Sequence, residues 1–171
     1  DAALSTESPP ELGREVFDHS PPPNAGMMLI WKRTAFMAGD PLNPNVLYFS
    51  RFDFPEAFPA LNTIEFDERI TGMFKTYIGL CVVTETAYWR ILNDNPDYTV
   101  DRAVNGMGCV GMRGAGSGRE MGWAVDRDGF RLYDLRTTIK ASEVIRDRVD
   151  AFNKVNLQES HVAHSRKDNA I

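Results

Sequence analysis

Short apolar runs separated by turn residues fill the chain from Gly26 onward. The runs are rich in aromatic and β-branched residues, and Gly, Pro, Asn and Asp stand between them. Runs of this kind, bounded by turn residues, are typical of β-strands. The pattern therefore predicts a mainly β protein built from many short antiparallel strands.

Three strand–turn–strand units repeat along this region, and they span residues 35–49, 80–91 and 122–133. When the units are aligned, Met37, Val82 and Val125 fall at matching positions, 45 and 43 residues apart. A fourth unit is expected to begin at Val162 and to turn at residues 165–169. Hairpins that recur at this spacing are typical of four-stranded propeller blades, which stack because one blade cannot cover both of its faces. A different β-sandwich or barrel, or a mixed α+β fold, is the alternative.

One helix is predicted near the C-terminus, over Ser142–Asn153. Ser142 is a candidate N-cap, and Ile145, Val149 and Phe152 then recur at i, i+4 and i+7. The helix is expected to be short and to pack against a sheet edge.

Two parts are expected along the chain. Residues 1–24 are rich in Pro, Ser and Glu, bury little apolar surface, and are predicted to be an extended lead-in lying on a neighbour. Residues 25–171 are predicted to be a propeller-like segment of about three blades, with the ring incomplete. The chain begins at Asp1 and ends just after a polar run, and we expect a segment of a longer polypeptide, or a processed or partly ordered one.

Composition narrows the class of protein. The 171 residues are 43% hydrophobic and 25% charged with a net charge of −5, and the absence of any Lys/Arg-rich run argues against a basic nucleic-acid footprint. No apolar stretch approaches the roughly 20 residues that a membrane span needs. Cys81 and Cys109 each lie inside an apolar run and are predicted to be buried free thiols, with a disulfide between them as the alternative.

Clusters that could carry chemistry have simpler explanations. Glu159, His161, His164 and Asp168 contain two histidines that could share a metal, but the alternating pattern around them puts the two rings on opposite faces of a strand. Solvated polar residues beside a turn are the prediction here, with no metal bound.

Two loops resemble ligand-binding motifs only in part. Asp126–Gly129 has the residue types found at the start of a calcium-binding loop, but the oxygen ligands that should follow are missing. A hairpin turn is therefore predicted there. Gly114–Gly118, between Arg113 and Arg119, could cradle a phosphate, but a strand and not a helix follows it. A flexible hairpin loop is therefore predicted at Gly114–Gly118.

No reaction centre emerges from the acidic or aromatic residues. Glu65, Asp67 and Glu68 could supply a carboxylate pair for glycoside hydrolysis, but no second cluster can be placed opposite them. Core packing is the expected role of most aromatic residues, among them Trp31, Trp89, Trp123, Tyr48, Tyr88 and Tyr133. The sequence thus predicts no catalytic, cofactor-binding or metal-binding residues, and a protein that is not an enzyme.

Residues 22–170 resemble the β-propeller tail and neck structural proteins of podovirus-type bacteriophages and related prophages. The resemblance rests on the order of strands and loops, carried by residues 39–50, Pro55–Pro59, Ile70–Met73, Thr86–Arg90, Gly108–Val110 and Asp126–Tyr133. It offers no catalytic signature to carry over.

The resemblance implies a structural component of a virion, in its tail, neck or nozzle. Such a protein assembles in a ring with other virion proteins and copies of itself, and DNA passes through as cargo. It would be made in the host cytoplasm and located in the virion, without a cofactor or a membrane span. A carbohydrate- or receptor-binding propeller is the alternative, and a propeller enzyme such as a glycosidase is a further one.

Overall fold

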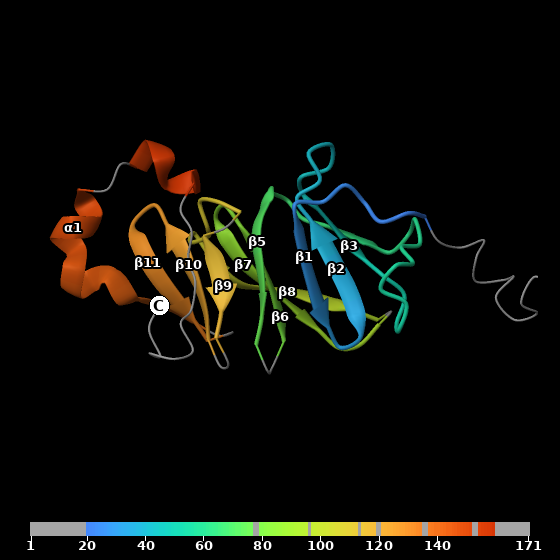
Figure 1. Ribbon diagram of the computed structural model, residues 1–171. Coiled ribbons are helices and arrows are strands. Elements are labelled where there is room, and N and C mark those ends of the chain that lie inside the picture. The colour runs from blue at the N-terminus through green and yellow to red at the C-terminus, as the bar shows by residue number, and fades with distance from the viewer. Residues whose placement is uncertain are drawn as a thin grey trace, which may run out of the picture.

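A computed structural model describes residues 20–76, 79–95, 97–112, 114–118, 121–134, 137–151 and 154–159. In this part of the chain twelve strands form three four-stranded antiparallel sheets, as Figure 1 shows. Each sheet is a meander in which strands that follow one another in the sequence are hydrogen-bonded neighbours. The predicted mainly β fold with propeller-like blades is confirmed.

The strands have the following bounds. The first sheet contains β1 (Met27–Trp31), β2 (Thr34–Ala38), β3 (Val46–Phe49) and β4 (Thr63–Glu65). The second contains β5 (Ile70–Lys75), β6 (Leu80–Thr84), β7 (Ala87–Leu92) and β8 (Thr99–Asn105). The third contains β9 (Ala115–Ser117), β10 (Gly122–Asp126), β11 (Gly129–Tyr133) and β12 (Thr138–Lys140).

The three predicted strand–turn–strand units are the central hairpins of the three sheets, β2–β3, β6–β7 and β10–β11. The predicted alignment of Val125 with Met37 and Val82 was wrong by one residue. Met37 pairs with Met28 of the first strand and Val82 with Met73, and the corresponding pair in the third sheet is Ala124 with Ala115. Because side chains alternate along a strand, Val125 lies on the opposite face from Ala124. The predicted fourth unit, from Val162, lies outside the described residues.

Tight turns set the register of two hairpins, β10–β11 and β1–β2. The turn between β10 and β11 consists of Arg127 and Asp128, and Gly129 after it has a φ of +124°, which glycine adopts without a steric penalty. The predicted hairpin turn at Asp126–Gly129 is therefore confirmed. Lys32 and Arg33 form the turn between β1 and β2, both with positive φ, although neither is glycine.

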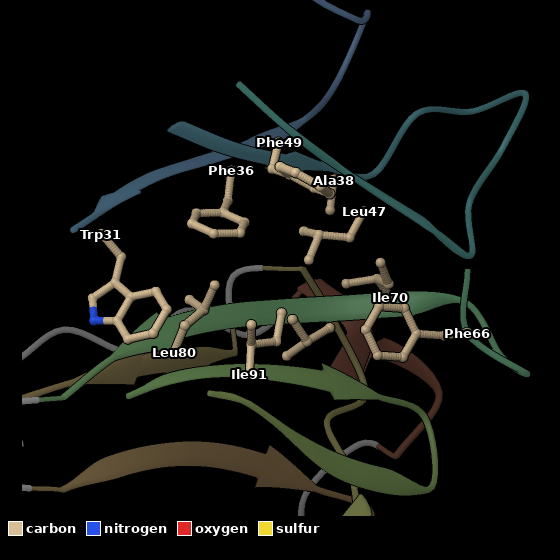
Figure 2. Packing of buried hydrophobic residues seen from close by; sticks show 10 residues of the cluster. Trp31, Phe36, Ala38, Leu47, Phe49, Phe66, Ile70, Leu80 and Ile91 are labelled. Atoms are coloured by element: carbon tan, nitrogen blue, oxygen red, sulfur yellow. The ribbon is translucent and has the colours of Figure 1, made fainter. Parts of the chain in front are cut away.

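A cluster of apolar side chains lies between the first and second sheets. Figure 2 shows Trp31, Phe36, Leu47 and Phe49 of the first sheet pointing toward the second sheet. Ile70, Leu80, Val82 and Ile91 meet them from the second sheet, and all four are fully buried. Burial of large apolar side chains is worth roughly 1.5–3 kcal/mol each, so this contact is a main source of stability.

A second cluster lies between the second and third sheets. From the second sheet it takes Phe74, Cys81, Val83 and Tyr88, and from the third Ala124 and Tyr133, with Cys109 from the connection between them. Tyr88 stacks on Tyr133 with ring centroids 4.6 Å apart. Cys81 and Cys109 are buried and unbridged, which confirms the prediction of free thiols. The second sheet is thus buried on both faces, and every residue of β6 is buried.

Two glycines let the second and third sheets approach closely. A Cβ on Gly122 would lie 2.0 Å from the Phe74 ring, and one on Gly72 would lie 2.6 Å from the Cβ of Ala115. Real side chains do not tolerate such distances, so glycine is required at both positions for this packing.

The C-terminal segment consists of η2 (Ala141–Ile145), α1 (Arg146–Asp150) and η3 (Lys154–Glu159) at the far side of the third sheet (Figure 1). The predicted short helix near the C-terminus is confirmed at residues 141–150, where the 3₁₀ turn η2 leads directly into α1. Residues 152–153 of its predicted span, Ser142–Asn153, lie outside the described residues. Ser142 does not cap the segment, since its hydroxyl accepts a hydrogen bond from the Phe130 N–H at 3.1 Å. This bond ties the segment to β11.

We expect the Gly122→Ala variant to be destabilised by about 1–3 kcal/mol, because the added methyl group must displace the Phe74 ring. Urea unfolding of wild type and variant measures the difference. Gly79→Ala is the matched control, since its Cβ would have no neighbour closer than 3.4 Å. Adding Phe74→Leu to Gly122→Ala should recover part of the loss. Equal stability of the two glycine variants would contradict the close approach of the sheets.

Candidate functional site

The first strands of the three sheets lie next to one another. β1, β5 and β9 are each at an edge of their sheet, and β5 contacts both of the others (Figure 1). Lys75 is the single charged residue in these three strands, and its ammonium donates to the carbonyl of Ile30 at 2.6 Å, which links β5 to β1. This row, which we call the inner edge, is therefore almost free of charge.

A second surface lies where loops of the first two sheets meet. Positive φ angles occur, among the described non-glycine residues, at Lys32 (45°), Arg33 (64°), Asp53 (68°) and Asn93 (68°). The Asp53 N–H donates to the Arg33 carbonyl at 3.0 Å, and the Lys32 ammonium lies 2.7 Å from a carboxylate oxygen of Asp94. All four strained residues therefore belong to one assembly, the loop cluster, formed by Lys32, Arg33, Ser50–Phe54 and Asn93–Asn95.

Backbone strain makes the loop cluster a candidate binding surface. A non-glycine residue in the left-handed region costs on the order of 1 kcal/mol, and such residues concentrate at ligand-binding and switch sites. A hydrogen bond links the loops of the two sheets and stabilises this arrangement: the Asn95 side-chain amide donates to the Ser50 carbonyl at 3.0 Å. The ion pairs themselves are exposed and contribute little stability.

The loop cluster also presents aromatic rings to solvent. Phe52 is 46% and Phe54 39% exposed, and the Arg33 guanidinium lies 4.9 Å from the centre of the Phe52 ring. The Lys32 ammonium lies 4.8 Å from the Trp31 ring. Exposed rings beside cations can stack on a flat ligand or a partner side chain. Apart from the Phe-rich run at residues 52–58, this surface has no signal in the sequence, because its parts are far apart in the chain.

Asp40 organises the loop between β2 and β3. Its carboxylate accepts hydrogen bonds from the Leu42 N–H at 2.9 Å, the Asn43 amide at 3.1 Å and the Tyr48 hydroxyl at 3.0 Å. The bond from the Leu42 N–H is the main reason that the pKa of Asp40 is lowered. Burial raises the pKa of Tyr48, with a further rise from Asp40. These groups hold a loop conformation and are not poised for proton transfer.

The carboxylates near the β10–β11 turn are bound by an arginine. Asp126 lies 2.8 Å from Arg131, and the two side chains are only 13% and 10% exposed. Asp126 also accepts from the Arg127 N–H, and the Asp128 carboxylate lies 3.9 Å from Arg131. A calcium ion would have to displace a buried guanidinium, so these residues fit an ion pair and not a metal site.

The thiols of the second cluster are unreactive in this environment. Burial raises the pKa of both Cys81 and Cys109, so each thiol stays protonated near neutral pH. Each sulfur also lies within hydrogen-bonding range of a backbone carbonyl, that of Val82 and that of Gly111 respectively. Both cysteines therefore act as small apolar residues of the core.

The other acidic candidates are held by separate partners. Glu65 accepts from the Asn45 amide at 3.1 Å, whereas Glu68 accepts from the Thr86 N–H at 3.0 Å. The hydrogen bond from the Thr86 side chain is the main reason that the pKa of Glu68 is lowered. Glu65 and Glu68 therefore have fixed structural partners, and neither faces a second carboxylate in these interactions.

The glycine-rich segment is not a loop. Residues 115–117 form β9, which pairs with β10, and the Trp123 ring covers Gly116 so closely that a Cβ there would lie 2.8 Å from the indole nitrogen. The predicted flexible hairpin loop at Gly114–Gly118 was therefore wrong. Arg113 and Arg119, which were to flank a phosphate, lie outside the described residues.

The predicted histidine cluster falls mostly outside the described residues. Glu159 is exposed at the end of η3, whereas His161, His164 and Asp168 lie beyond it. Within the described ranges, no three His, Cys, Asp or Glu side chains lie together as a metal site would require. Among the described helices, none has the length and apolar character to cross a membrane.

The aromatic residues named from the sequence mostly pack in the core, as expected. Trp31, Trp123, Tyr88 and Tyr133 are buried, and Trp89 packs against the cluster between the first two sheets. The fold thus defines a class: an all-β protein of stacked meander sheets. No protein-family model matches the chain, and no curated protein sequence is significantly similar to it.

We expect Asp40→Asn to lower the thermal midpoint at neutral pH, because the charge-assisted hydrogen bonds to the loop are weakened. The folded-state pKa of Asp40 lies below its unfolded value, so its stabilisation is complete above the unfolded pKa and is lost as pH falls through the folded pKa. Thermal unfolding from pH 7 to pH 2 should show the difference between wild type and variant shrinking at the acid end. Glu56→Gln, at an exposed position, is the control and should show no such convergence. A difference that stays constant with pH would contradict the role of the carboxylate.

Proposed function

We propose that this protein is a structural component of a bacteriophage virion, in the tail, neck or nozzle. It assembles there with other virion proteins and with copies of itself around the channel through which DNA leaves. The protein is made in the host cytoplasm, acts in the virion, and has no catalytic role and no cofactor.

The stacking of the three meander sheets carries this proposal. Successive sheets stack face to face with their first strands adjacent, the arrangement by which propeller blades surround an axis. It agrees with the resemblance of residues 22–170 to phage tail and neck propellers.

The scarcity of positive charge on the inner edge supports a channel wall that does not bind the DNA phosphates. Proteins that hold DNA place Lys and Arg against the phosphates, and each such contact adds to the affinity and its salt dependence. The inner edge has Lys75 alone, and its ammonium is already bound to the Ile30 carbonyl. The net charge of −5 points the same way, since an acidic surface repels the DNA backbone.

We expect antibodies raised against the chain to label purified virions at the tail or neck, and the chain to co-purify with the particles at a fixed ratio to the major tail protein. Immunogold electron microscopy and quantitative mass spectrometry of particles measure both. Particles produced when the phage gene for this chain carries a stop codon should lack the tail or neck structure. A chain that is abundant in the lysate and absent from intact particles would overturn the proposal.

A second candidate function is carbohydrate or receptor binding through the loop cluster, favoured by the exposed rings of Phe52 and Phe54. Aromatic rings at a loop surface stack on sugar rings and on apolar partner groups. In this case a glycan array or host cell envelope should bind the wild type, and Phe52→Ala/Phe54→Ala should bind at least tenfold more weakly. Leu61→Ala is the matched control, because Leu61 is 92% exposed and lies outside the cluster. Equal binding by all three proteins would exclude this surface.

A further inference from the structure

The two contacts between sheets in this chain follow one pattern. Each sheet has a face toward the sheet before it in the sequence and a face toward the sheet after it. The paired residues Met73 and Val82 lie on the preceding-side face of the second sheet, and Ala115 and Ala124 lie on that face of the third. Val82 and Ala124 are fully buried by the neighbouring sheet. The same face of the first sheet carries the equivalent pair.

Among the described residues, that equivalent face is covered only in part, since Ala35 is fully buried there. Met28 pairs with Met37, and Ile30 with Ala35, so these four side chains lie on one face, opposite to the face that packs on the second sheet. Met28 is 58% and Ile30 48% exposed. The four residues carry no charge, so another apolar sheet could cover them without burying an unpaired ion.

The other end of the stack is covered only in part. Trp123, Leu132 and Ile139 form one row across the third sheet, on the face that points away from the second. Trp123 is 4% exposed, whereas Ile139, in the edge strand β12, is 52% exposed. Of the described residues, those of the helical segment tied to β11 therefore leave Ile139 about half exposed on this face.

Exposed large apolar side chains in the described strands occur only at these two ends. They are Met28 and Ile30 on the first sheet and Ile139 on the third, and the second sheet has none. A contact between the first sheet of one molecule and the third sheet of another would cover both ends at once. It would also continue the face-to-face order that already joins the first sheet to the second and the second to the third.

We propose that copies of this chain associate head to tail, with the first-sheet face around Met28 and Ile30 packing against the third-sheet face around Ile139 of the next copy. Such a contact joins two different surfaces, and it generates a closed ring when the rotation per copy closes. The inference deepens the proposed virion role and rests on it for the biological setting, whereas the contact itself rests on the exposed faces.

Sedimentation velocity of the full chain over a range of concentrations tests the contact. We expect the wild type to form oligomers, and Ile30→Asp and Ile139→Asp each to associate about tenfold more weakly or worse, because each variant places a charge in an apolar contact. Both residues are about half exposed, so the variants should keep the circular-dichroism spectrum and thermal midpoint of the wild type. Leu42→Asp is the control, since Leu42 is 88% exposed in the loop between β2 and β3 and belongs to no strand, and it should associate like the wild type.

Mixing the two variants distinguishes head-to-tail from symmetric association. Ile30→Asp keeps an intact third-sheet face and Ile139→Asp an intact first-sheet face, so an equimolar mixture should form a dimer with one molecule of each and nothing larger. Self-association of Ile139→Asp alone would instead mean that two first-sheet faces meet symmetrically, and this would overturn the proposal. A wild type that stays monomeric at all concentrations would overturn it too.

These outcomes are separate from those for the virion role. If the oligomers depend on Ile30 and Ile139 but the chain is absent from virions, the contact is supported and the proposed function is rejected. A chain present in virions whose association is unaffected by both aspartates would reject the contact and sustain the function.

Discussion

Burial of the second sheet on both of its faces is the constraint on which the rest of the structure depends. β6 is buried at every residue, so Leu80 and Val82 must be covered by the first sheet while Cys81 and Val83 are covered by the third. Both coverings bring backbones close together, and on the side of the third sheet this is achieved with glycine at positions 72 and 122. The same stacking sets the first strands of all three sheets side by side.

The first and third sheets, at the two ends of the stack, differ from the second sheet in the exposure of their large apolar side chains. Inside the stack, each apolar face meets another, and no large apolar side chain of the second sheet is exposed. At the ends, the first sheet presents Met28 and Ile30 and the third presents Ile139. Propeller architectures cover every blade face by placing another blade against it, and the proposed contact between copies would do the same at these two ends.

Several charged groups of the described residues hold the structure together. Asp126 and Arg131 neutralise each other in the partly buried space beside the turn, and Asp40 holds the loop between β2 and β3. The thiols are kept protonated by burial. Strain, exposed rings and unpartnered apolar faces are found instead at the surface, in the loop cluster and at the ends of the stack. The proposed binding and assembly roles rest on these surface features.

Local sequence alone determined the central hairpins, the Asp126–Gly129 turn and the buried thiols, because apolar runs and turn residues act over a few positions. Tertiary contacts decided the remainder. Ala115–Ser117 has no apolar run and becomes a strand because β10 and the Trp123 ring cover it, and Ser142 binds β11 instead of capping a helix. Likewise, the exposed faces of the first and third sheets, and the meeting of Lys32, Asp53 and Asn93 in one cluster, depend on how distant segments pack. A pattern within one strand carries no information about which neighbour will cover it.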